Sequence, residues 1–140
     1  MTIAQMSWGL MKYPVNDPRL KEFLDSLSEV YRLAEEHKGF LWRIPDEVIA
    51  AELAACGFDG RMSATVSVWR SLADLHDYTF NSLHGVYLKR TSEWFEKVEG
   101  PQLVVWDVEE EARPSFIEAW ERLQELKRNG PSQRGYGWKR

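Results

Sequence analysis

The order in which strand-like and helix-like patterns follow one another constrains the fold of this chain more than any other feature. Alternating polarity and β-branched composition predict four strands, over 3–11, 40–44, 63–71 and 102–110. Helical spacing of apolar side chains predicts helices over 17–39, 71–98 and 115–130. This order is typical of an α+β fold, the ferredoxin-like split βαβ unit, with a four-stranded antiparallel sheet and helices on one face.

Local signals place the ends and breaks of these helices. Ser71 and Ser115 each stand three residues before an acid, which is the serine-x-x-acid signature of a helix start. We expect Gly39 to end the first helix in a left-handed turn and the second helix to bend or break near Asn81. Residues 46–61 predict either a short helix or a loop excursion, because alanines are followed by turn residues.

The length, composition and net charge of the chain favour one globular domain and exclude several classes of function. A chain of 140 residues with 44% hydrophobic and 29% charged residues suits a single domain, here 1–130, followed by a C-terminal tail over 131–140. The net charge of -4 offers no basic stripe for nucleic acid. We expect no membrane partner and a cytoplasmic location, because no apolar run suits a signal peptide or a membrane span.

The predicted strands carry apolar side chains on both faces. Trp69 opposes Val66 and Val68, and Trp106 opposes Val105. A sheet that is apolar on both faces is buried on both. We therefore expect two subunits to stack their sheets in a symmetric homodimer.

Four motifs, in a fixed order along nearly the whole chain, resemble those of a known family. They are "GFLWR", "FDGRMSATVSVWRS", "NSLHGVYLKRTSEWF" and "PQLVVWDVEEEARPSFIEAWERL". This combination resembles a bacterial domain-of-unknown-function family, DUF3291, among the dimeric α+β barrel proteins and alongside the antibiotic-biosynthesis monooxygenases. Relatives of this kind typically have a pocket between the sheet and its helices, so the resemblance implies such a pocket here.

The chain departs from the family pattern in two places. It has the alanine-rich "VIAAELAACG" where the family often continues into a polar glycine-asparagine loop. The family also tends to carry more arginine after the histidine, and only Arg90 corresponds here. The family has no agreed activity, so the resemblance implies a fold rather than a reaction.

Candidate site residues follow from their chemistry. His84 is a candidate general base or acid, because imidazole titrates near neutral pH, and the alternative is a histidine with a purely structural partner. Arg43 and Arg90 are candidates for holding an anionic or enolate oxygen. Aromatic and polar residues at strand and helix spacing predict a substrate pocket: Trp8, Trp42, Trp69, Tyr78, Tyr87, Trp94 and Ser67.

Two classes of function fit these residues. The first is a cofactor-independent monooxygenase, cyclase or isomerase of natural-product metabolism, acting on an apolar aromatic or polyketide-like substrate. The second is a non-catalytic dimer that binds a small ligand or is purely structural. A haem-binding oxygenase with His84 as axial ligand is a further alternative. Cys56 is the only cysteine and histidines are few, so we expect no metal site.

Overall fold

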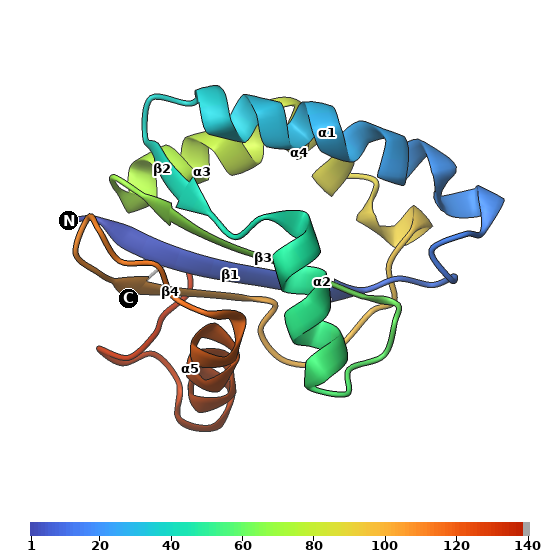
Figure 1. The fold of residues 1–140 in the computed structure, drawn as a ribbon. Helices are drawn as coiled ribbons and strands as arrows, with labels where there is room; N and C mark the ends of the chain where they lie inside the picture. The colour runs from blue at the N-terminus through green and yellow to red at the C-terminus, as the bar shows by residue number, and fades with distance from the viewer. Residues whose placement is uncertain (139–140) are drawn as a thin grey trace.

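The structure, a computed structural model, describes residues 1–138 without the side chain of Leu83 (Figure 1). Its strands form one antiparallel sheet in the order β2-β3-β1-β4. Their bounds are β1 Ile3–Leu10, β2 Phe40–Arg43, β3 Met62–Trp69 and β4 Leu103–Asp107. The predicted α+β class and the four-stranded antiparallel sheet are thus confirmed.

The helices follow the predicted order, with short 3-10 turns at Pro18–Leu20 and Thr91–Glu93. Their bounds are α1 Lys21–Glu36, α2 Asp46–Ala55, α3 Leu72–Asn81, α4 Leu83–Leu88 and α5 Phe116–Asn129. The predicted caps are present, since Ser71 Oγ accepts from the backbone N–H of Asp74 and Ser115 Oγ from that of Glu118, both at 3.1 Å. The predicted break near Asn81 is the junction between α3 and α4, and the excursion after β2 is the helix α2.

Helices cover both faces of the sheet, which corrects the prediction of helices on one face. Figure 1 shows α1, α3 and α4 on one side and α5 on the other. On the first side, Val30 and Tyr78 pack against Trp69. On the second side, Phe116 and Leu123 belong to the cluster built on β1, β3 and β4.

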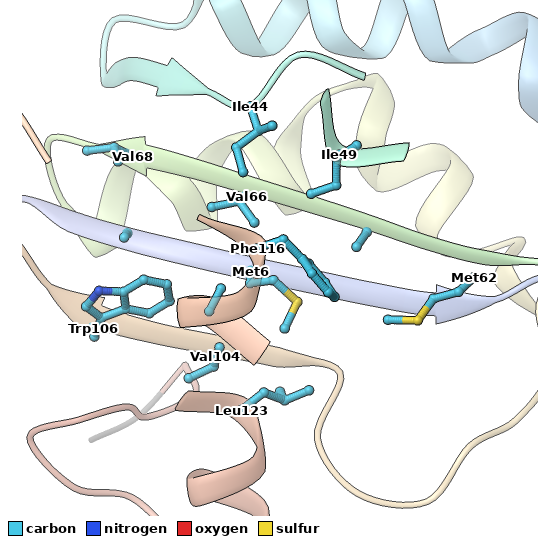
Figure 2. Packing of buried hydrophobic residues seen from close by; sticks show 13 residues of the cluster. Met6, Ile44, Ile49, Met62, Val66, Val68, Val104, Trp106, Phe116 and Leu123 are labelled. Carbon is cyan, nitrogen blue, oxygen red and sulfur yellow. The ribbon is translucent and has the colours of Figure 1, made fainter. Parts of the chain in front are cut away.

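The apolar stripe of α5 explains this arrangement. Phe116, Ala119 and Leu123 lie on one helix face and are at most 2% exposed. Figure 2 shows Phe116 and Leu123 in one cluster with Met6 and Val104 from the sheet. The second apolar face is therefore covered within the chain, by α5 together with α2, which contacts α5 and β3. The homodimer stays a prediction, but this face no longer argues for it.

Gly39 serves a different purpose from the one predicted. Helix α1 ends at Glu36, and His37 is already extended, with φ of -67° and ψ of 139°. Gly39 does not have a positive φ. A Cβ at this position would lie 2.3 Å from the Asp74 Cβ, so Gly39 is needed for the close approach of the β2 start to α3.

The C-terminal segment, predicted as a tail, packs along β4 as far as the structure describes it. The backbone N–H of Val105 donates to the Tyr136 carbonyl at 2.7 Å, and that of Tyr136 donates back at 2.8 Å. Tyr136 is 3% exposed and its hydroxyl donates to Asp107 Oδ1. Residues 139 and 140 of the predicted tail lie outside the described residues. Among the helices of the described chain, none has the length and apolar character needed to cross a membrane.

Candidate functional site

A cavity of about 420 Å³ lies between the sheet and the helices α1, α3 and α4. This volume falls within the range of small-molecule sites, roughly 300–1,000 Å³. The strands β1 and β3 supply its floor mainly through residues of one parity, such as Gln5 and Ser67, because side chains alternate between the faces of a strand. The helices supply walls that are mostly apolar.

Aromatic side chains form much of these walls. The rings of Trp69 and Tyr78 are stacked with centroids 5.2 Å apart. Trp94 contacts Phe23 at 5.4 Å and Tyr87 at 5.9 Å between centroids. All five line the cavity. Of the aromatic residues predicted from the sequence, the structure therefore places Trp69, Tyr78, Tyr87 and Trp94 together.

A hydrogen-bonded row of polar side chains forms the cavity floor, and we call it the polar floor: Gln5, Ser7, Thr65 and Ser67. The strand register sets Gln5 opposite Ser67 and Ser7 opposite Thr65. Gln5 Nε2 donates to Ser67 Oγ at 2.7 Å, and Ser7 Oγ donates to Gln5 Oε1 at 2.6 Å. Trp69 Nε1 also donates to Ser67 Oγ, at 2.8 Å. The predicted Ser67 is thus a fixed part of the cavity.

His84 lines the cavity from the start of α4, next to the ring of Tyr78 at 5.2 Å between centroids. Its Nδ1 lies 3.1 Å from the Thr79 carbonyl oxygen. Because a carbonyl can only accept, Nδ1 carries the proton and Nε2 of the neutral ring carries a lone pair. No described residue makes a hydrogen bond to Nε2. One ring nitrogen is therefore held by the fold, and the other can accept a proton from a ligand.

The surroundings of His84 favour its neutral form. Burial lowers the pKa of His84 below its usual 6.5, and the hydrogen bond to the Thr79 carbonyl offsets this only in part. Burial raises the pKa of Tyr78 and raises that of Tyr31 to about 12, where the nearby Asp46 adds to the effect. At neutral pH the cavity therefore holds a neutral imidazole at His84 and protonated phenols at Tyr31 and Tyr78.

Arg43 lines the cavity at the end of β2. Its guanidinium carbon lies 4.5 Å from the centroid of the Tyr31 ring, and Nη1 donates to Asp46 Oδ1 at 3.1 Å. Its Nε is buried without a hydrogen-bond partner and lies 3.9 Å from Glu35 Oε2. The charge of Arg43 is thus already matched by carboxylates, which limits its value as a binder of anions.

The structure does not bring the predicted Arg90 into the cavity. Its guanidinium donates to Glu22 at 2.9 Å and to Glu93 at 2.7 Å, and it covers the ring of Trp94 at 4.8 Å. Arg90 is not among the described residues around the cavity. The structure therefore gives it a stabilising position behind the aromatic wall.

Two of the predicted tryptophans also point elsewhere. Trp8 borders the cavity, yet its indole packs edge-on against Trp120 at 5.5 Å, in the cluster on the α5 side. Trp42 packs against the same cluster, with the Arg113 guanidinium 5.4 Å from its ring centroid. The parity of β1 explains the first case, because Trp8 shares a face with Met6 rather than with Gln5.

Sequence reasoning missed several residues around the cavity, and a signal existed for some of them. Gln5 and Thr65 alternate with apolar residues in their strands, so pairing the two strands antiparallel brings these polar side chains together. Phe23 and Phe95 meet at 5.1 Å through a contact between distant segments that no local pattern reveals. Within residues 1–138, no group of three or more histidine, cysteine, aspartate or glutamate side chains is arranged to hold a metal ion.

Comparison with known proteins identifies the family. Residues 2–140 match the family described as "Domain of unknown function (DUF3291)". The chain therefore belongs to this family, as its motifs suggested. No curated protein matches.

A solved structure described as "Structural Genomics, protein YJCS" is similar with a TM-score of 0.49 and 13% sequence identity. The match covers 78% of this chain and 100% of the other. It supports no inference about activity.

Proposed function

We propose that this protein is an enzyme that binds a small, planar, largely apolar molecule in the cavity and removes a proton from it with His84. The observation that carries the proposal is the fixed tautomer of His84, in which the Thr79 carbonyl holds Nδ1–H and leaves the Nε2 lone pair available. The lowered pKa of His84 supports it as well, because a histidine that is neutral at physiological pH is ready to act as a base.

The size and lining of the cavity support an aromatic or polyketide-like substrate. Flat aromatic walls such as Trp69 and Tyr78 suit a flat ligand. The polar floor gives a ligand oxygen hydrogen-bonding groups close to the site.

Proton removal is the first step of several reactions of cofactor-independent enzymes in this wider fold group. Deprotonating an activated phenol or enol prepares it for oxygenation, and deprotonating carbon beside a carbonyl prepares it for cyclisation or isomerisation. The proposed kinship with antibiotic-biosynthesis monooxygenases fits this chemistry. We therefore propose that the protein catalyses the proton transfer, while the later bond changes depend on the chemistry of the substrate.

A surrogate substrate tests the proposal directly. β-Tetralone is a flat bicyclic ketone whose benzylic α-protons exchange with solvent, and proton NMR in buffered D₂O follows their loss. We expect the protein to accelerate this exchange above the rate in buffer, and saturating fluorene, an inert aromatic competitor, to abolish the acceleration. Exchange at the buffer rate, with fluorene still bound, would favour the alternative of a non-catalytic binding protein.

Haem is a second candidate occupant, because ligating histidines also donate their other ring N–H to a carbonyl, as His84 does. The other residues fit haem poorly. Arg43 is the one lysine or arginine among the described residues around the cavity, and it is already paired with Asp46, so two propionates would lack cationic partners. We therefore derive no step through haem.

A further inference from the structure

The hydroxyl of Ser67 has a fixed hydrogen-bonding role within the polar floor. Its oxygen accepts from Gln5 Nε2 and from Trp69 Nε1, at 2.7 Å and 2.8 Å. A serine hydroxyl offers two lone pairs and one donor. With both lone pairs occupied, the O–H proton remains, and none of the described residues accepts it.

The Ser67 hydroxyl lies at the cavity and not in bulk water. Ser67 lines the cavity and is 7% exposed, and Gln5 beside it is 4% exposed. A buried donor without a partner costs free energy, so an acceptor on a ligand is favoured at this point.

We propose that Ser67 donates a hydrogen bond to a neutral acceptor oxygen of the substrate, and that Gln5 is the positioning residue that restricts Ser67 to donating. This inference rests on the proposed function, since it specifies the substrate of the same cavity. The substrate class is a flat apolar molecule with a carbonyl or an equivalent oxygen, whose charge develops only as His84 removes the proton. A donor placed at that oxygen stabilises the developing charge.

The charges around the cavity argue for a neutral rather than an anionic substrate. Arg43 is the only lysine or arginine among the described residues that line it, and Asp46 and Glu35 lie 3.1 Å and 3.9 Å from its guanidinium. Burying a carboxylate without a free cation is costly. The Ser67 hydroxyl provides a hydrogen bond without a full charge, which suits a ketone.

Three tricyclic probes of similar shape separate the contribution of apolar contact from that of a hydrogen bond accepted or donated by the ligand. Fluorene makes no hydrogen bond, fluorenone only accepts, and carbazole only donates through its N–H. Binding is measured by isothermal titration calorimetry or by quenching of tryptophan fluorescence. For the wild-type protein we expect fluorenone to bind ~3- to 10-fold more tightly than fluorene, as one net hydrogen bond provides, and fluorene carboxylate to bind more weakly than fluorenone.

Variants of the polar floor test which side chain causes fluorenone to bind more tightly than fluorene. Ser67→Ala should abolish the advantage of fluorenone over fluorene. Ser63→Ala is the matched control, because Ser63 lies on the same strand and also lines the cavity, and it should keep the advantage. Gln5→Met frees a lone pair of Ser67, so fluorenone should lose affinity while carbazole gains it. A purely structural role of Gln5 would instead weaken all three probes together.

Each remaining outcome overturns a particular claim. If none of the three probes binds the wild-type protein, the proposed function itself fails. If they bind with equal affinity, or Ser67→Ala keeps the preference for fluorenone, the proposed function stands and this inference fails. Tighter binding of the carboxylate would overturn the neutral substrate. If Ser67→Ala does not melt cooperatively, the Gln5→Met variant tests the inference instead. A loss of fluorenone affinity with a gain of carbazole affinity supports it, and unchanged relative affinities overturn it.

Discussion

Replacing His84 with asparagine should lower the catalysed exchange of β-tetralone about 100-fold, the lower end of what a general base contributes. Asparagine keeps an N–H donor for the Thr79 carbonyl, which His84 Nδ1 now bonds at 3.1 Å, but it has no basic nitrogen. The variant should therefore retain its melting temperature while losing the reaction. The wild-type rate should fall only as the pH drops through a pKa below 6.5.

His76→Asn is the matched control for this experiment. His76 packs against Phe80 and Trp138, with ring centroids 4.6 Å and 5.2 Å away, and it is not among the described residues around the cavity. Its replacement should leave the exchange rate within a factor of about two, since it offers no base at the site. If His84→Asn exchanges β-tetralone as fast as His76→Asn, His84 has a structural role alone.

Replacing Phe116 with alanine should lower the free energy of unfolding by about 3–5 kcal/mol. Phe116 is 0% exposed and contacts Phe58 and Trp120, with centroids 5.6 Å and 5.8 Å away. Removing its ring leaves a cavity in the cluster that holds α5 on the sheet. Urea unfolding followed by circular dichroism measures the change.

The neighbouring Ile117 provides the control for packing. It is 41% exposed on the outer side of α5, so Ile117→Ala should change the free energy of unfolding by about 0.5 kcal/mol or less. Equal effects of the two variants would mean that α5 does not pack on the sheet as described. The second face of the sheet would then be open to a partner, as the sequence first suggested.

Local patterns predicted the elements of this fold well. The caps at Ser71 and Ser115 and the break near Asn81 depend on side chains within a few residues of each backbone group, so a short window contains the information. The position of α5 could not be predicted from local patterns, because an amphipathic helix can pack on either apolar face of a sheet. Only the tertiary packing of Phe116 and Leu123 decides between them.

The candidate site was predictable in part for the same reason. His84 and Tyr78 both line the cavity, and their inward position follows from the helical spacing of α4 and α3. Trp8 borders the cavity, but its indole packs on the α5 side. Its shared parity with Met6 was visible in the sequence, but the sequence did not show which face of the sheet holds the cavity. Arg90 forms an ion pair with Glu22, which lies 68 positions away in the chain. No sequence pattern indicates that pair, so the position of Arg90 outside the cavity could not be predicted.

The protonation state of His84 is the most direct test of this account. Long-range ¹H–¹⁵N NMR of the imidazole identifies which ring nitrogen carries the proton, and a pH titration gives the pKa. We expect a neutral ring at neutral pH, protonated at Nδ1 and unprotonated at Nε2, with a pKa below 6.5. A ring protonated at Nε2, or an imidazolium that persists at neutral pH, would contradict the proposal that His84 is the base.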